Sequence, residues 1–285
     1  MNWTTLVSPR ELAHALGAPS LRVVDARFVL AGADADAGEQ AWRASHLPGA
    51  GYVSLDRDLS DLRKPASEGR HPLPEAAEFR GVLERLGISP QDQVVVYDAG
   101  DGAMAAARFW WLLTLLGHRR VAVLDGGFAA WTSLGLPVTA DAPAPVRSVY
   151  PGDFDRRMIA DTAEVQQRLP NGDAVLLDAR APERFRGDLE PLDRAAGHVP
   201  GARNRPFSRN LADGRFRAAD DLRAEFVALL DGAPPSKVLL SCGSGVTACH
   251  NLLAMEHAGL HGARIYAPSW SGWVSDPSRP IETGD

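Results

Sequence analysis

The two thiols of the chain, Cys242 and Cys249, both lie in the stretch SCGSGVTACH (residues 241–250). The apolar run KVLLS precedes Cys242 and two glycines follow it, so the pattern predicts a buried strand, a tight loop and a helix. Backbone N–H groups of such a loop, with those of the helix start, form a nest that stabilises a thiolate. We therefore predict that Cys242 is a nucleophile, whereas Cys249 packs on the apolar face of the helix.

Two other chemistries fit this stretch poorly. Cysteine phosphatases need an arginine six residues after the cysteine to bind phosphate with two hydrogen bonds, and this chain has Ala248 there. A metal site of Cys242, Cys249 and His250 matches none of the usual ligand spacings. We expect no bound metal or other cofactor, and a buried structural role is the remaining alternative for Cys242.

An internal repeat shows that the loop has a counterpart earlier in the chain. Four pairs of segments occur in one order: LRVVDAR (21–27) and AVLLDAR (174–180), SHLPGA (45–50) and GHVPGA (197–202), QVVVYDAG (93–100) and KVLLSCGS (237–244), VLDGGFAAW (123–131) and IYAPSWSGW (265–273). This order indicates a tandem duplication. Because the first copy has Asp98 where the second has Cys242, only the second copy can perform thiol chemistry.

The elements that must position the cysteine alternate between short buried strands and helices in both copies. This alternation predicts two small α/β domains, each with a parallel sheet flanked by helices. We expect domains at residues 1–138 and 158–285, joined by a linker rich in Pro and Gly at residues 139–157. Ligands of such sheets bind at the carboxyl ends of the strands, where Cys242 is placed.

These features together resemble the tandem-domain rhodanese family of sulfurtransferases, over nearly the whole chain. The resemblance rests on the two copies, the HLPGA and GHVPGA segments, and the loop CGSGVTA beside a degenerate first site. It implies that Cys242 carries sulfur as a persulfide between a donor and a thiophilic acceptor. It also implies that the loop backbone cradles this sulfur, through Gly243, Gly245, Val246 and Thr247.

The composition of the loop resembles one branch of that family. Thiosulfate-using members tend to carry basic residues after the cysteine, whereas the neutral CGSGVT resembles the 3-mercaptopyruvate branch. This branch binds the donor carboxylate with an arginine in an RF step, which implies that role for Arg184. A second arginine follows a Glu-Pro step in the family, and here it is displaced to Arg194. Thiosulfate as the donor remains the alternative.

The resemblance also implies residues that move protons. Related enzymes pair a serine, here Ser244, with the histidine of the first HIPGA segment, here His46, and with an aspartate before it. The aspartate is not fixed, because Asp34 and Asp36 both lie in the preceding loop. His46 has a structural alternative, since His198 occupies its place in the second copy. Arg70 and His71, in EGRHPLP, resemble a family segment near the domain interface.

The composition excludes several other classes of protein. The chain has 285 residues, a net charge of −6 and no Lys/Arg block, so neither nucleic acid nor an anionic membrane is an expected partner. Two cysteines, no signal-like start and no spanning apolar run favour the cytoplasm. The expected partners are a small sulfur donor and an acceptor such as cyanide, a thiol or a thioredoxin-like dithiol. A non-enzymatic persulfide carrier and a structural module with a dead site remain alternatives.

Overall fold

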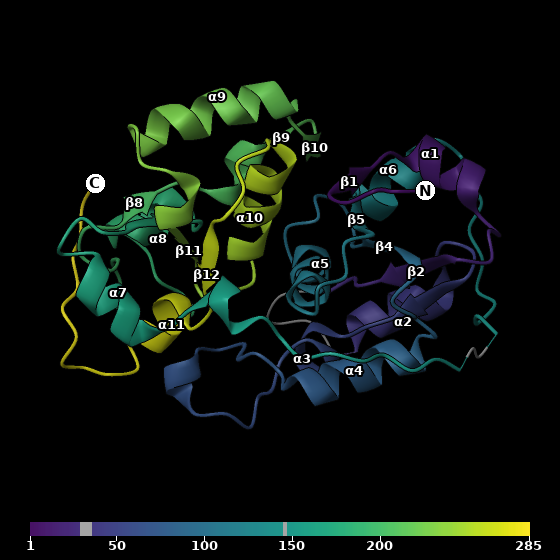
Figure 1. Cartoon of the computed structure of the whole chain (residues 1–285), viewed down its shortest axis with the longest axis horizontal. Coiled ribbons are helices and arrows are strands. Elements are labelled where there is room, and N and C mark those ends of the chain that lie inside the picture. Colours follow the sequence, from purple (N-terminus) through teal and green to yellow (C-terminus); the bar gives the residue numbers. More distant parts are fainter. Residues whose placement is uncertain (29–35, 145–146) are drawn as a thin grey trace. The chain divides into compact units, whose positions relative to one another are not determined.

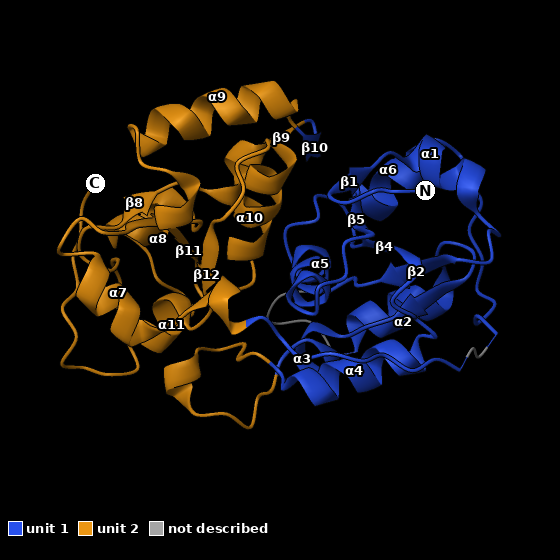
Figure 2. Cartoon of the chain, in the orientation of Figure 1, with its two compact units in different colours: residues 1–60, 74–155, 213–216 blue, residues 61–73, 156–212, 217–285 orange. Residues whose placement is uncertain are grey.

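The computed structural model describes residues 1–28, 36–144 and 147–285, and the chain divides into two compact units (Figure 2). The first unit comprises residues 1–60, 74–155 and 213–216, and the second comprises residues 61–73, 156–212 and 217–285. These units differ from the continuous ranges predicted above, because residues 61–73 and 213–216 are each grouped with the opposite half of the sequence.

The first unit is built on a five-stranded parallel sheet with the order β1-β5-β4-β2-β3 (Figure 1). Its strands are β1 (Leu6–Val7), β2 (Leu21–Asp25), β3 (Ala50–Tyr52), β4 (Gln93–Tyr97) and β5 (Val121–Leu124), and the short strand β10 (Arg215–Phe216) also belongs to this unit. The helices are α1 (Pro9–Ala15), α2 (Ala37–Ala44), α3 (Leu55–Asp58), α4 (Ala76–Arg85), α5 (Ala105–Leu115) and α6 (Gly127–Ser133).

The second unit repeats this topology in the order β6-β12-β11-β7-β8. Its sheet contains β6 (Ile159–Ala160), β7 (Val175–Asp178), β8 (Arg203–Asn204), β11 (Val238–Ser241) and β12 (Arg264–Tyr266), and β9 (Leu211–Ala212) lies outside it. The helices are α7 (Thr162–Arg168), α8 (Pro182–Arg186), α9 (Ala219–Leu230), α10 (Ala248–His257) and α11 (Ser269–Trp273), and 3-10 turns occur at Ala66–Glu68, Arg156–Met158, Phe207–Asn210 and Pro235–Lys237. Two α/β units with parallel sheets confirm the predicted fold class.

The central strands β4 and β11 contain the apolar runs of the sequence that indicated buried strands. Every residue of β4 and of β11 is buried, as expected for parallel strands that are covered on both faces. Each of these strands ends in a loop that leads into a long buried helix, α5 after β4 and α10 after β11. The sequence stretch at residues 241–250 therefore lies at the carboxyl end of a central strand.

Each of the two HxPGA segments pairs with a later segment of its own unit through an isolated antiparallel bridge. His46 exchanges backbone hydrogen bonds of 2.8 and 2.9 Å with Thr139, and His198 exchanges bonds of 2.8 and 3.0 Å with Glu282. The glycine of each segment adopts a positive φ, at Gly49 and Gly201. Since both copies make the same contact, the motif has a structural function in each unit.

Candidate active site

The thiol of Cys242 lies in a closed backbone loop between β11 and α10. Its side chain is buried, and the Gly245 N–H donates a hydrogen bond of 3.1 Å to Sγ. Gly245 has a φ of +75°, and a Cβ at this position would lie 2.4 Å from the carbonyl oxygen of Ala267. Only glycine therefore allows the chain to turn its N–H toward the sulfur here.

The start of α11 holds this loop in place. Trp270 N–H donates to the carbonyl of Cys242 at 3.0 Å, and Ser271 N–H donates to that of Gly243 at 2.9 Å. The Cys242 N–H donates to Ser269 Oγ at 3.1 Å, and Ser269 has a φ of +52° that is unusual outside glycine. This serine is a site residue that the sequence analysis missed, although its counterpart in the first copy is Gly127, which adopts a similar φ of +55°.

The same clamp occurs in the first unit and identifies corresponding atoms. Phe128 N–H donates to the carbonyl of Asp98 at 2.9 Å, and Ala129 N–H donates to that of Ala99 at 3.0 Å. Asp98 thus corresponds to Cys242, as predicted. Its carboxylate accepts hydrogen bonds from the N–H groups of Gly100 and Gly102 at 3.2 and 2.9 Å. The first loop therefore binds an anion supplied by its own chain.

The second loop offers corresponding donors to an anion. Ser244 and Val246 correspond to Gly100 and Gly102, and in the described part of the chain their N–H groups have no protein hydrogen-bond partner. The same holds for the N–H of Thr247. An anionic sulfur bound to Cys242 can therefore be received by this nest.

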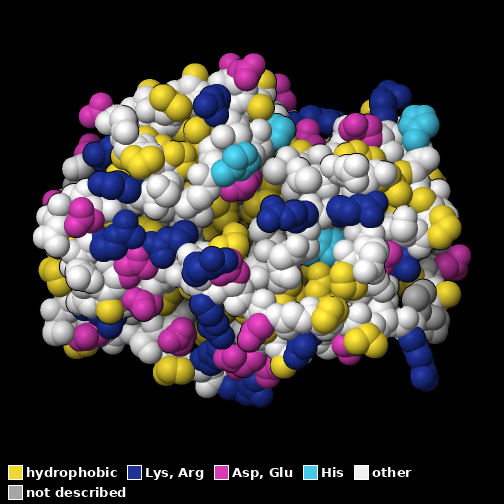
Figure 3. Space-filling view, in the orientation of Figure 1, with side chains coloured by type: hydrophobic (Ala, Val, Ile, Leu, Met, Phe, Trp, Pro, Cys, Tyr) yellow, Lys and Arg dark blue, Asp and Glu magenta, His cyan; other side chains and the backbone are white. Residues whose placement is uncertain are grey.

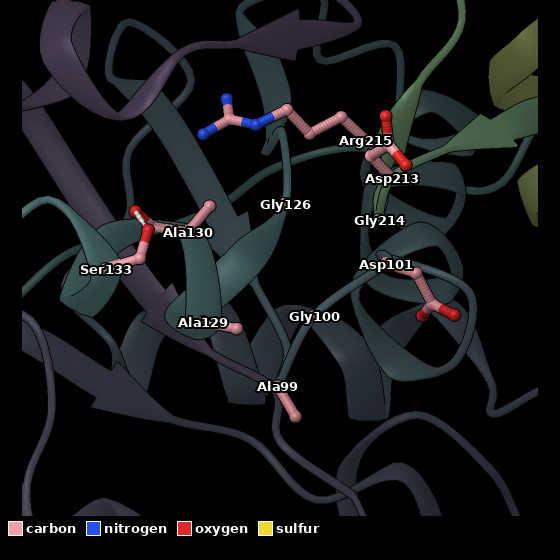
Figure 4. Close-up of a pocket in the computed structure, with 10 residues that line it drawn as sticks. All are labelled: Ala99, Gly100, Asp101, Gly126, Ala129, Ala130, Ser133, Asp213, Gly214 and Arg215. Atoms are coloured by element: carbon pink, nitrogen blue, oxygen red, sulfur yellow. Dashed lines mark hydrogen bonds between the residues drawn. The ribbon is translucent and has the colours of Figure 1, made fainter.

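An open pocket of about 640 Å³ lies at the loop of the first unit (Figure 4). The lining residues come from that loop, from α6 with the residue before it, and from residues 213–216: Ala99, Gly100, Asp101, Gly126, Ala129, Ala130, Ser133, Asp213, Gly214 and Arg215. Burial, with the nearby charge of Asp101, raises the pKa of Asp98 to about 6. No cysteine lines this pocket, so we place the thiol chemistry in the second unit.

A buried ion-pair cluster adjoins Cys242. Arg180 binds the carboxylate of Asp178 at 2.7 Å and that of Glu190 at 3.4 Å. Burial disfavours the charge of Arg180, but the negative charge of Asp178 raises its pKa above the ordinary value. Glu190 raises the pKa of Arg180 further, and a negative charge on Cys242 would act in the same direction.

The structure places the guanidinium of Arg184 beside the cysteine loop. Its Nη1 and Nη2 atoms lie 3.5 Å from the position that a Cβ of Gly243 would occupy. The guanidinium is held from behind by Glu190, with Nη2–Oε1 and Nη2–Oε2 distances of 2.7 and 2.9 Å, and by Asp193 at 3.2 Å. The absence of a side chain at Gly243 leaves space between the arginine and the loop.

The partner of Ser244 is His71, not His46. Ser244 Oγ lies 2.8 Å from His71 Nδ1, and both residues are buried in the second unit. His46 belongs to the first unit, where its two ring nitrogens face the carbonyl oxygens of Trp42 and Asp141 at 2.7 and 3.1 Å. Both ring nitrogens of His46 are therefore already engaged by the backbone, which agrees with the structural alternative.

The aspartates considered for His46 do not complete a triad in the described structure. Asp36 is exposed and pairs with Arg57 at 2.6 Å, and Asp34 lies outside the described residues. Arg194 is likewise directed elsewhere, because its Nε donates to the backbone carbonyl of Val274. The displacement of this arginine in the sequence thus corresponds to a different contact in the structure.

Cys249 has the packing role that the sequence predicted. It is fully buried in α10, and its thiol donates to the carbonyl of Gly245 at 3.3 Å. Neither cysteine forms a disulfide within the part of the chain that the structure describes. Among those residues, the acidic, histidine and cysteine side chains also form no cluster of three suited to a metal ion.

Figure 3 shows the distribution of charged side chains on one face of the molecule. On the face drawn in Figure 3, basic and acidic side chains are interspersed rather than gathered in a field of one sign. None of the helices in the described residues has the length and apolar character that crossing a membrane requires.

Comparison with known proteins agrees with this geometry. The model of the rhodanese-like domain matches residues 8–134 and 161–276. A probable 3-mercaptopyruvate sulfurtransferase of Pseudomonas aeruginosa is 46% identical, with all of both chains covered. A putative thiosulfate sulfurtransferase of Mycobacterium tuberculosis is 39% identical over 98% of this chain and 97% of its own. The crystal structure of the Escherichia coli 3-mercaptopyruvate sulfotransferase SseA has a TM-score of 0.82 at 29% identity, covering 94% of this chain and 99% of that one.

Proposed function

The chain belongs to the rhodanese-like domain family, and from this premise we propose that it is a sulfurtransferase that uses 3-mercaptopyruvate as its donor. The observation that carries this proposal is the position of Arg184 beside Gly243. The arginine lies at a neutral loop in which the N–H groups of Ser244, Val246 and Thr247 have no protein acceptor among the described residues. A guanidinium at this place suits a donor that carries a carboxylate, and the nest suits a persulfide anion.

In the first half-reaction, the Cys242 thiolate attacks the sulfur of 3-mercaptopyruvate. The new S–S bond forms as the C–S bond of the donor breaks, and its electron pair passes to the methylene carbon as the enolate of pyruvate. Protonation of that carbon gives pyruvate, and Cys242 is left as a persulfide. The reaction needs no external oxidant or reductant, because the sulfur is oxidised to the level of a persulfide while the methylene carbon of the donor is reduced to the methyl group of pyruvate.

The Ser244–His71 pair is suited to the proton transfer in this step. Hydroxyl and imidazole lie at hydrogen-bond distance, 2.8 Å, and both are shielded from solvent. We assign them the role of moving the proton from the donor thiol toward the enolate. This proposal gives His71 the part that the sequence analysis had predicted for His46.

In the second half-reaction, an acceptor attacks the outer sulfur of the persulfide and releases the Cys242 thiolate. Cyanide would leave as thiocyanate, and a thiol would leave as a persulfide. A dithiol such as a thioredoxin-like protein would go on to release sulfide and become a disulfide. The covalent intermediate predicts ping-pong kinetics for each of these acceptors.

The test is pyruvate release from 3-mercaptopyruvate with cyanide as acceptor. We expect turnover in the wild type and none in Cys242→Ser, whereas Cys249→Ala should remain active because its thiol packs inside α10. Mass spectrometry after donor treatment should add one sulfur atom at Cys242. Faster turnover of thiosulfate than of 3-mercaptopyruvate would overturn the donor assignment, and labelling without turnover would favour a carrier.

Thiosulfate is the second candidate donor, because a relative at 39% identity carries the name of a putative thiosulfate sulfurtransferase. The neutral loop gives a dianion no side-chain cation of its own, so we rank this donor second. We further propose that residues 158–285 form the catalytic domain and residues 1–138 a non-catalytic one, supported by Asp98 in the first loop. Two cysteines outside any disulfide support a cytoplasmic location.

A further inference from the structure

Arg184 lies on a short helix, α8, that is too short to hold its own position. The helix has five residues, Pro182–Arg186, and ends at Gly187 with a φ of +88°. A helix of this length is not stable by itself, so its place depends on the contacts that it makes with the rest of the unit. The position of Arg184 relative to the cysteine loop therefore depends on what α8 packs against.

His198 clamps this helix at the residue that follows Arg184. Its ring stacks on that of Phe185, with the ring centroids 3.7 Å apart and an angle of 7° between the planes. Its Nδ1–H donates a hydrogen bond of 2.8 Å to the backbone carbonyl of Phe185. Because both side chains are buried, water does not compete for either contact. Side chain and backbone of Phe185 are thus both fixed by one histidine.

The end of the chain holds His198 in turn. His198 exchanges its two backbone hydrogen bonds with Glu282, whose Oε2 accepts a further bond of 2.9 Å from the Gly201 N–H. Two residues later, the Gly284 N–H donates to the carbonyl of Arg186, the last residue of α8, at 2.9 Å. The end of the chain therefore joins the GHVPGA segment to the helix.

Glycines let these three segments approach closely. A Cβ at Gly197 would lie 2.4 Å from the carbonyl oxygen of Glu282. A Cβ at Gly187 would lie 3.0 Å from Thr283 Cγ2 and 3.2 Å from the nitrogen of Gly197. Since no side chain fits between the helix end, the GHVPGA segment and the end of the chain, α8 has little freedom to shift.

The first unit contains the same clamp without an arginine to position. His46 stacks on Trp42 of α2, with the centroids 5.0 Å apart and an angle of 23°, and its Nδ1–H donates to the Trp42 carbonyl at 2.7 Å. The residue before Trp42 is Ala41, whereas the residue before Phe185 is Arg184. Only in the second unit does the clamp hold a cation beside a thiol.

We propose that His198 is a positioning residue for the donor, because it fixes α8 through Phe185 and so sets the distance between Arg184 and the cysteine loop. This inference rests on the proposed function, in which that arginine binds the donor carboxylate. Glu190 and Asp193 hold the guanidinium itself, whereas His198 holds the backbone from which the side chain starts. A shift of that backbone would lengthen the hydrogen bonds to the carboxylate.

The test compares 3-mercaptopyruvate with mercaptoacetone, which has the same thiol and ketone but no carboxylate. In His198→Ala we expect kcat/KM for 3-mercaptopyruvate to fall about tenfold or more, mainly through KM, because a displacement of about 1 Å misplaces a charged hydrogen-bond donor. The loss should not extend to mercaptoacetone, which makes no such bond. His198→Asn keeps an N–H for the Phe185 carbonyl and should recover part of the loss.

His46→Ala is the matched control, since it breaks the same clamp in the unit whose loop has Asp98 in place of the cysteine. Both alanine variants should lower the melting temperature, but only His198→Ala should raise KM. Phe185→Leu is a second variant that keeps an apolar side chain in the buried position and removes the stacked ring. It should also raise KM for 3-mercaptopyruvate.

An unchanged KM in His198→Ala and Phe185→Leu, or equal losses with both donors, would overturn the positioning role of His198 while pyruvate release by the wild type upheld the proposed function. A wild type that releases no pyruvate would overturn both.

Discussion

Replacing Gly245 by alanine tests whether backbone geometry makes the sulfur site. The left-handed conformation, with φ at +75°, costs an alanine about 1–2 kcal/mol. The added methyl group would lie 2.4 Å from the Ala267 carbonyl oxygen and 3.2 Å from its carbon, and a backbone group cannot rotate away. Overpacking of this kind costs about 1–3 kcal/mol, so we expect Gly245→Ala to lower the free energy of unfolding by about 2–5 kcal/mol in total.

The chain offers a control that separates the two costs. Gly232 also has a positive φ, +82°, and belongs to the same unit, but a Cβ there would meet no atom within 4 Å. Gly232→Ala should therefore cost only the backbone term, about 1–2 kcal/mol. Urea unfolding followed by tryptophan fluorescence measures both variants, and Trp270 and Trp273 of α11 report on the second unit.

The same substitution should affect the chemistry. Relief of the clash moves the Gly245 N–H away from Cys242 Sγ, which it now contacts at 3.1 Å. We expect single-turnover formation of the Cys242 persulfide to slow by about ten- to hundredfold, since one hydrogen bond to an anion is lost. Gly232→Ala should retain the wild-type rate. If the two variants unfolded at the same urea concentration and formed persulfide equally fast, the account of the loop given above would be refuted.

Two further predictions follow from the contacts around each loop. His71→Ala should slow 3-mercaptopyruvate cleavage about a hundredfold or more in stopped-flow measurements, because Ser244 loses its proton partner, whereas His46→Ala should retain the rate and lower the melting temperature. The pKa of Asp98 is about 6 in the folded protein and about 3.9 when unfolded, so the stability it contributes is present at low pH and is lost as pH rises through 6. Asp98→Asn should remove this component, about 3 kcal/mol between pH 3.5 and 7.5, from urea unfolding measured across that range.

The nucleophile could be predicted from the sequence because its determinants are local. A buried strand, a cysteine and two glycines within ten residues specify the loop. Comparison of the two copies shows that the second has a thiol, Cys242, where the first has Asp98. The partner of Ser244 could not be predicted in this way. His71 lies 173 residues earlier, in a segment that packs in the second unit, and no periodic pattern reports that crossing.

The internal repeat indicates that the role of His46 is structural rather than catalytic. A histidine present in both copies, of which only one has a nucleophile, is better explained by a task that both copies share. The paired backbone bonds of His46 and His198 are such a task. His71 lies outside the four repeated segments, and a histidine that only one copy requires would have been the stronger candidate.

Both units keep a backbone nest that can bind an anion, but the two units use it differently. In both units the helix after the next strand clamps the loop by the same two backbone bonds, so the N–H groups of the nest are fixed before any ligand arrives. In the first unit the Asp98 carboxylate occupies those donors, and burial raises its pKa because the enclosure opposes its charge. In the second unit Cys242 accepts a hydrogen bond from the N–H of Gly245, whereas the N–H groups of Ser244 and Val246 meet no protein acceptor among the described residues. An added sulfur atom lengthens the Cys242 side chain toward that of Asp98, whose carboxylate binds the corresponding nest in the first unit. The persulfide is therefore the state that the second loop is suited to hold.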